Sequence, residues 1–178
     1  MSMDVIAGGT AGPFAAACVV LVVAGFSKIR RPRATRPAAS ALGLPDSRAA
    51  VRLLGTIEVV TATTALAIGG VAAAAVAIVY SALALAAWRL FVQSPGTACG
   101  CLGASDAPVS PTHIAVNVAA ALLATIAITR SAPIAAAGSG LWERAAFIVL
   151  VGCCASLIAL VLDALPTLNA AMRQGGPR

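Results

Sequence analysis

Charged residues are scarce in this chain, and so are aromatic ones. Asp, Glu, Lys and Arg make up 10% of its 178 residues, and Phe, Trp and Tyr make up 4%. Soluble domains carry roughly 25% charged residues, so an ordinary soluble domain is excluded. Hydrophobic residues reach 60% and the mean hydropathy is +0.97. The chain is predicted to be an all-α integral membrane protein with a single domain, residues 1–178.

Sequence patterns of nucleotide and haem chemistry are also missing. The single histidine, His113, excludes a haem held by paired histidines. No glycine-rich dinucleotide pattern and no phosphate-binding loop occur. The basic residues lack interleaved aromatic residues, so we expect no nucleic-acid partner. The sequence therefore calls for no cofactor.

Long apolar runs predict the membrane helices, because about 20 apolar residues cross a bilayer core. The run 53–88 holds one charge, Glu58, and is too long for one crossing, so it is expected to turn back at Gly69-Gly70. We expect five spans, with four as the alternative: residues 5–26, 53–68, 71–92, 113–129 and 145–162. The remaining segments are a basic loop at 28–52, a second loop at 93–112 and a short polar tail at 167–178.

The distribution of Lys and Arg predicts the orientation of these spans. The segment 28–52 holds seven of the twelve basic residues. Cytoplasmic loops carry the excess of Lys and Arg, so we expect this segment inside, where it would also contact anionic lipid. Alternation then places 93–112 inside and the amino terminus outside.

No basic residue precedes the first span, so we expect it to be retained rather than cleaved as a signal peptide. Arg and Ala are abundant, as in GC-rich bacterial genomes, and the predicted location is the bacterial plasma (inner) membrane.

The loop 93–112 contains two thiols one residue apart, Cys99-Gly100-Cys101-Leu102-Gly103. Glycine between the cysteines lets the backbone bend as a short-range disulfide demands. Nearby cations favour the reactive thiolate, and Arg89 and His113 flank the loop. The pattern predicts thiol–disulfide exchange at Cys99 and Cys101.

Two other interpretations of this CxC motif remain open. A static disulfide would fasten the loop, although the reducing cytosol disfavours it. A metal ion would need Cys99, Cys101, His113 and Asp106 as ligands, but their spacing fits no common zinc pattern. We therefore predict no metal site.

Polar residues at the ends of the predicted spans are candidates for supporting roles. His113 and Asn117 share one helix face, and His113 could exchange the proton that thiol chemistry requires. Its alternative role is to cap or anchor the helix.

Glu58 lies about 7–8 Å inside the second span. A carboxylate at that depth should be paired, and Lys28 is the expected partner, in a contact that could be structural alone.

Cys18, Cys153 and Cys154 are predicted to lie near the middle of the membrane, about 15 Å from the cytoplasmic helix ends. A disulfide or a relay of thiols between them is geometrically allowed. Packing as small hydrophobic residues is the favoured interpretation.

Four sequence features in this order resemble the methylamine utilisation protein MauE family, within the broader DoxX-like group. They are Gly25-Phe26-Ser27-Lys28, Leu54-Gly55-Thr56-Ile57-Glu58, the segment Cys99–Gly103, and His113 with Asn117. The resemblance covers roughly residues 19–117 and extends less distinctly to the fifth span. Family members usually carry Phe where this chain has Leu102, and Cys153-Cys154 are outside the pattern.

The resemblance implies a DoxX-like four-helix core and redox-associated help in maturing extracytoplasmic proteins. In the family the client is methylamine dehydrogenase, which is rich in disulfides, and a thioredoxin-like partner is common. By analogy, Cys99 and Cys101 would carry redox equivalents. An extracytoplasmic client conflicts with a cytoplasmic CxC loop. Either the loop re-enters the bundle, which we prefer, or the partner is cytosolic, or the span count is off by one.

Two hypotheses follow. The first is a membrane thiol–disulfide carrier using Cys99 and Cys101, assisted by His113, Glu58 and Lys28. The second is a non-catalytic subunit that anchors an oxidoreductase complex. A transporter or quinone-linked subunit has only the buried Glu58 in its favour.

Overall fold

The computed structural model describes residues 3–94, 96–97, 108–129 and 140–174. Within these residues the chain forms six helices and no strand. Their bounds are α1 Met3–Arg30, α2 Pro32–Ala41, α3 Arg48–Ile68, α4 Val71–Gln93, α5 Pro111–Ala127 and α7 Leu141–Gln174. The predicted all-α membrane bundle is confirmed.

Four helices are long and apolar enough to cross a membrane, by length and composition. They are α1 from Thr10 to Arg30, α3, α4, and α7 from Leu141 to Leu162. The apolar helix α5 is shorter, with 17 residues. The bundle therefore agrees with the expectation of four to five spans, and this is a multi-pass membrane protein.

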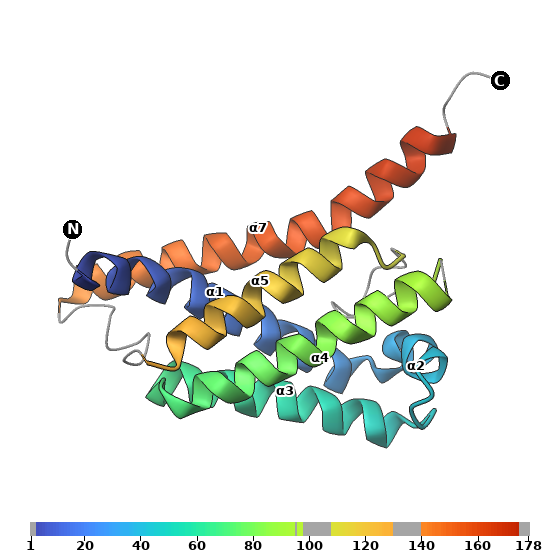
Figure 1. Cartoon of the computed structure of the whole chain (residues 1–178), viewed down its shortest axis with the longest axis horizontal. Helices are drawn as coiled ribbons and strands as arrows, with labels where there is room; N and C mark the ends of the chain where they lie inside the picture. Colours follow the sequence, from blue (N-terminus) through green and yellow to red (C-terminus); the bar gives the residue numbers. More distant parts are fainter. Residues whose placement is uncertain (1–2, 95, 98–107, 130–139, 175–178) are drawn as a thin grey trace.

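Helix α1 lies at the centre of the bundle and contacts α2, α3, α5 and α7. It packs most extensively against α3, while α4 packs most extensively against α5. Figure 1 shows α7 running beside α1, with its carboxyl-terminal part extending past the other helices. Half of the apolar window of α1 is buried, against 17% for α7. Most of the surface of α7 between Leu141 and Leu162 therefore faces outward.

Small residues dominate the core of the bundle. Ala17 and Cys18 of α1, Ala62 of α3, Ala73 of α4 and Ala124 of α5 belong to one buried cluster. Lipid tails are as apolar as the helix surfaces, so membrane helices gain little from burying hydrophobic area. Small residues stabilise them instead, because they let the backbones approach closely. The side chain of Tyr80 crosses this cluster and donates a hydrogen bond to the carbonyl of Ala17 at 2.6 Å.

The turn between α3 and α4 falls at Gly69-Gly70, as predicted. Both glycines have positive φ angles, 60° and 53°, which side chains rarely adopt. The apolar run 53–88 therefore folds into two antiparallel helices. Helix α3 ends where predicted, at Ile68, but starts earlier, at Arg48. Helix α4 starts where predicted, at Val71, and ends at Gln93.

The segment 28–52, expected as a basic loop, contains the helix α2. Pro32 occupies its first turn, where the missing N–H costs nothing, and Gly43 at φ 75° follows its end. Pro32, Thr35, Ala38 and Ala39 form its buried face. Helix α2 therefore packs on the bundle along one side.

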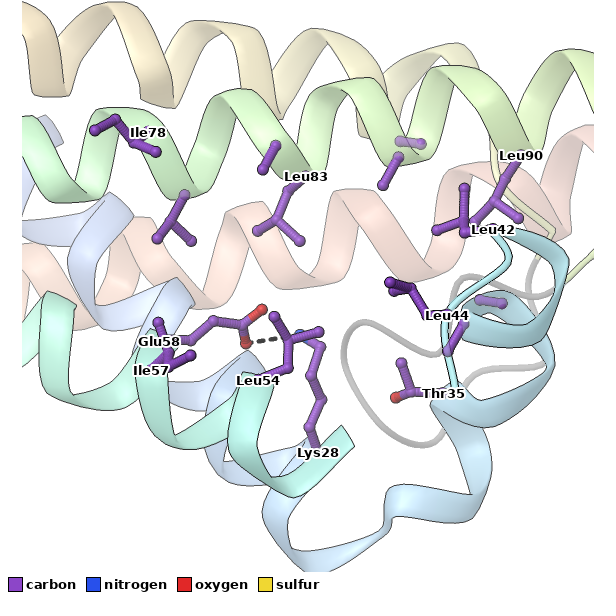
Figure 2. Close-up of a pocket in the computed structure, with 16 residues that line it drawn as sticks. Lys28, Thr35, Leu42, Leu44, Leu54, Ile57, Glu58, Ile78, Leu83 and Leu90 are labelled. Atoms are coloured by element: carbon purple, nitrogen blue, oxygen red, sulfur yellow. Dashed lines mark hydrogen bonds and ion pairs between the residues drawn. The ribbon is translucent and has the colours of Figure 1, made fainter. Parts of the chain in front are cut away.

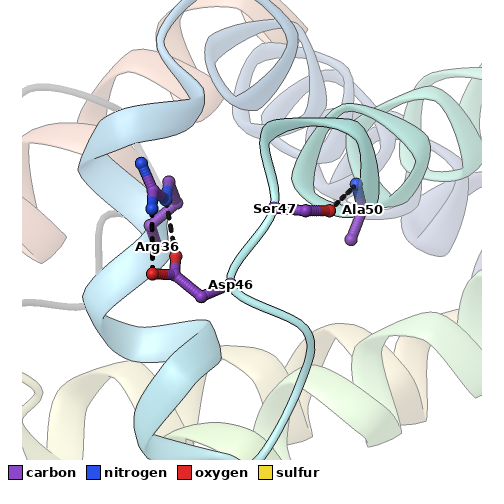
Figure 3. A network of polar contacts seen from close by, with 4 residues as sticks. All are labelled: Arg36, Asp46, Ser47 and Ala50. Carbon is purple, nitrogen blue, oxygen red and sulfur yellow. Dashed lines mark hydrogen bonds and ion pairs between the residues drawn. The ribbon is translucent and has the colours of Figure 1, made fainter.

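The connection from α2 to α3 is closed by polar contacts (Figure 3). Arg36 donates to both carboxylate oxygens of Asp46, at 2.5 and 2.8 Å. Ser47 caps α3 by accepting from the backbone N–H of Ala50 at 3.0 Å. These contacts hold α2 against the start of α3.

Candidate functional site

Cys99 and Cys101 lie outside the described residues, as do Asp106 and the glycines of the motif. The chain on either side of them is described. The backbone N–H of Thr97 donates to Ser94, and the N–H of Val109 donates to the carbonyl of Thr97 at 3.1 Å. The two ends of the segment 98–107 are therefore held together by a direct hydrogen bond.

The base of this segment is packed against the bundle. Val109 is buried in a cluster with Ala38 of α2 and with Ala87 and Leu90 of α4. Leu42 and Ile114 pack against the same cluster. The CxC segment therefore starts and ends at the end of the bundle that carries α2 and the basic residues. This agrees with the alternation of spans that placed both segments on one side.

His113 serves as part of a helix cap. Its Nδ1 accepts from the backbone N–H of Ser110 at 3.3 Å and lies 3.0 Å from Ser110 Oγ, in a capping box at the start of α5. A backbone N–H can only donate, so Nδ1 accepts, and the neutral ring carries its proton on Nε2. Asn117 Nδ2 donates to the carbonyl of His113 at 2.8 Å. Helix capping, one of the two roles considered for His113, is present, and proton exchange stays a prediction.

Lys28 and Glu58 form the expected ion pair. Lys28 Nζ donates to Glu58 Oε2 at 2.7 Å, and the two residues are 1% and 0% exposed. The contact joins the end of α1 to α3. The pairing predicted from the sequence is therefore confirmed, whereas a role of the pair in chemistry stays a prediction.

Gly25 and Gly55, whose packing role the sequence did not predict, set the geometry of this pair. A Cβ built on Gly55 would lie 2.5 Å from the carbonyl oxygen of Gly25, and a Cβ on Gly25 would lie 2.6 Å from that of Gly55. The backbones of α1 and α3 therefore touch at this crossing. Lys28 and Glu58 each follow one of these glycines by three residues, so both charges lie on the crossing face. A glycine three positions before Lys28 and another three positions before Glu58 are the signal that would have predicted the contact.

The remaining candidate residues are dispersed. Arg89 is exposed on α4. Cys18 is buried in the central cluster, Cys154 packs against the cluster of Ala15, Ala16 and Val151, and Cys153 is exposed. These three cysteines are free thiols, as packing residues would be. Among the described residues, no group of three His, Cys, Asp or Glu side chains is placed to hold a metal ion. Of the four metal ligands considered from the sequence, Cys99, Cys101 and Asp106 lie outside the described residues.

An all-helical, alanine-rich membrane bundle with a buried Lys–Glu pair at a glycine crossing defines a small multi-pass membrane protein. The family model described as Methylamine utilisation protein MauE matches residues 10–130. The chain therefore belongs to the MauE family, a family of membrane proteins associated with methylamine utilisation. The match begins within α1, at residue 10, extends through α5 and ends before α7. No curated protein and no solved structure matches the chain.

Proposed function

We propose that this protein is a membrane thiol–disulfide carrier that supports the maturation of extracytoplasmic proteins. Cys99 and Cys101 form the reactive pair. The observation that carries the proposal is the anchored base of the CxC segment, where Val109 is buried against α2 and α4 and hydrogen-bonds to Thr97. Preorganised ends limit the conformations of a reactive loop and favour one geometry of attack.

The reaction is a two-electron exchange with a thioredoxin-like partner. A thiolate of the reduced pair attacks the disulfide of the partner and forms a mixed disulfide, and one partner sulfur leaves as a thiolate. The second thiol of the pair then displaces the other partner sulfur. The pair ends as the Cys99–Cys101 disulfide and the partner as a dithiol, so two electrons and two protons have moved. The reverse sequence of steps reduces the pair.

The residues near the base have supporting roles in this proposal. His113 carries its ring proton on Nε2, so Nε2 is the ring nitrogen that can donate a hydrogen bond. Arg89 contributes positive charge at the same end of α4, which favours a thiolate. The location proposed for the protein is the bacterial inner membrane, with the basic end of the bundle in the cytoplasm.

The test replaces both cysteines of the motif. Cys99→Ser with Cys101→Ser should abolish maturation of the disulfide-rich client, because neither sulfur remains to exchange. The matched control is Cys153→Ser with Cys154→Ser, which removes two thiols outside the MauE match and should leave maturation intact. Membrane insertion of both variants is checked by the amount of protein in the membrane fraction.

A non-catalytic anchor would behave differently. If the Cys99→Ser, Cys101→Ser variant supports full client maturation, the carrier function is wrong and the anchoring subunit is favoured. Trapping of a mixed disulfide between the single Cys101→Ser variant and a thioredoxin-like protein would support the carrier directly, because the resolving thiol is then missing.

A further inference from the structure

A cavity of about 270 Å³ lies between α2, α3 and α4, at the end of the bundle near the CxC segment. Figure 2 shows α3 and α4 on its two sides, with α2 across the end. Helices α3 and α4 contact each other less than either contacts its main partner. They diverge from the tight turn at Gly69-Gly70, and α2 lies near their far ends (Figure 1).

The wall of the cavity is almost entirely apolar. Leucine, isoleucine, valine and alanine side chains supply thirteen of its sixteen residues, and the others are Lys28, Thr35 and Glu58. The charges of Lys28 and Glu58 cancel. A charged ligand would face one of them as a repulsive neighbour in a low-dielectric region, whereas a neutral ligand would not. The wall therefore suits a neutral, largely apolar molecule.

Among the described residues, one oxygen of Glu58 has no hydrogen-bond partner. Oε2 accepts from Lys28, but Oε1 is buried and accepts no hydrogen bond within the part of the chain that the structure describes. In Figure 2 the carboxylate of Glu58 points into the space between α3 and α4. An ionised carboxylate oxygen is a strong acceptor, and leaving it unpaired away from water is unfavourable. A ligand in the cavity that carries a donor group would remove this cost.

One opening of the cavity lies between α3 and α4. Ile57 of α3 and Ile78 of α4 line it and are 47% and 70% exposed on the apolar surface of the bundle. Both helices are membrane spans, so this opening faces hydrocarbon. The ligand is therefore one that dissolves in the membrane and enters sideways between α3 and α4.

We propose that this cavity is a binding site for a neutral, membrane-soluble hydroxyl compound. Its hydroxyl group donates to Oε1 of Glu58, and its apolar body lies between Leu54 of α3 and Leu83 of α4. The volume is just below the roughly 300–1,000 Å³ of sites for drug-sized ligands, so a body of one or two fused rings fits. The site is independent of the exchange chemistry proposed for Cys99 and Cys101.

The test uses the full-length protein in phosphatidylcholine nanodiscs and two probes of nearly the same shape. The first is 2-naphthol, which has a hydroxyl donor, and the second is 2-methoxynaphthalene, which has none. Binding is measured by equilibrium dialysis against empty nanodiscs, to subtract partition into lipid. We expect saturable binding of 2-naphthol and at least about tenfold weaker binding of the methyl ether, because a buried acceptor left unpaired penalises the second probe.

A cavity-filling variant locates the binding site. Ala86→Phe places a ring in the cavity while leaving Lys28 and Glu58 in place, and should weaken 2-naphthol binding at least about tenfold. Leu85→Phe is the control on the same helix, because Leu85 is 48% exposed and does not line the cavity. It should change binding less than about twofold. Circular dichroism and elution as a single species confirm that both variants fold.

Three outcomes would overturn the proposal. They are the absence of saturable 2-naphthol binding to the wild-type protein, equal affinity for the two probes, and unchanged binding by the Ala86→Phe variant. Equal affinity would indicate an apolar groove filled by lipid chains. The comparison of the two probes needs no variant, so the proposal remains falsifiable if Ala86→Phe fails to fold.

Discussion

At the scale of single residues, the buried Lys28–Glu58 pair places two charges inside membrane spans. Charged groups within membrane spans are expensive unless they are paired, and here each supplies the only counter-charge of the other among the described residues. The contact joins α1 to α3, and its two residues are 30 positions apart in the sequence. Removing one partner leaves an uncompensated charge, whereas removing both leaves none.

This asymmetry predicts the behaviour of variants at the two positions. Lys28→Met and Glu58→Met should each lower the unfolding free energy by about 3–5 kcal/mol, and the double variant should lower it by less than either single change. The unfolding free energy is measured by reversible denaturation in mixed micelles with increasing sodium dodecyl sulfate. Additive losses in the double variant would contradict a direct interaction between Lys28 and Glu58.

Asp46 gives the surface a pH-dependent contact. The hydrogen bonds from the Arg36 guanidinium hold the pKa of Asp46 below its usual 3.8. A carboxylate whose folded pKa is depressed stabilises the protein above its unfolded pKa, and this contribution is lost as the pH falls through the lower folded pKa. Between about pH 5 and pH 3, the wild-type protein should therefore lose more stability than Asp46→Asn.

Thermal unfolding at several pH values measures this difference. Both side chains of the Arg36–Asp46 pair are partly or well exposed, so the effect should be small and should shrink in high salt. Identical pH profiles for the wild-type protein and Asp46→Asn at low salt would show that the contact does not couple to folding.

At the scale of helices, the crossing of α1 and α3 depends on the two facing glycines. Gly25 and Gly55 leave no space for a side chain, because each Cβ position falls within 2.6 Å of the opposite carbonyl oxygen. The close approach brings the Lys28 and Glu58 side chains, which lie on the same face, into direct contact. The glycines and the ion pair therefore form one structural unit.

Adding a single methyl group tests this unit. Gly55→Ala should lower the unfolding free energy by about 1–3 kcal/mol, since α1 and α3 must move apart and lengthen the Lys28–Glu58 contact. The matched control is Gly152→Ala on α7, where a Cβ would meet nothing within 4 Å. The control should be neutral or stabilising, by up to about 1 kcal/mol, because alanine favours helices. Equal effects of the two changes on unfolding in mixed micelles would contradict the proposed crossing.

At the scale of the whole molecule, one end of the bundle gathers the polar features. Helix α2, the Lys28–Glu58 pair, the capped start of α5 and the base of the CxC segment all belong to it. The opposite end carries the glycine turn between α3 and α4. The excess of basic residues predicts that the first of these ends faces the cytoplasm.

Labelling with a membrane-impermeant maleimide tests this orientation. In a variant that keeps only the two motif cysteines, Cys99 and Cys101 should react in inverted membrane vesicles and also in intact cells, because a re-entrant loop is reached from both sides. Leu44→Cys marks the basic end and should react only in inverted vesicles, whereas Val71→Cys marks the opposite end and should react only in intact cells. Both marker positions are well exposed. Labelling of Cys99 and Cys101 in inverted vesicles alone would contradict re-entry and favour a cytosolic partner.

Sequence and structure agree where a single segment decides the outcome. The Gly69-Gly70 turn follows from an apolar run that is too long for one crossing. The Lys28–Glu58 contact joins two segments, but a carboxylate inside a span needs a partner, and this requirement predicted it. The helix α2 was missed because Pro32, Pro37 and the charges around them read as a loop. Its formation depends on a buried face that packs against α3 and α4.

The sequence by itself determined that this protein is a helical membrane bundle, because hydrophobicity and turn residues act locally along each segment. Only the tertiary structure decided which helix faces meet. The Gly25–Gly55 crossing and the Oε1 of Glu58, which has no partner among the described residues and lies beside a cavity, depend on steric fit or hydrogen-bond geometry. Those properties arise between groups in three dimensions, and no single run of residues encodes them.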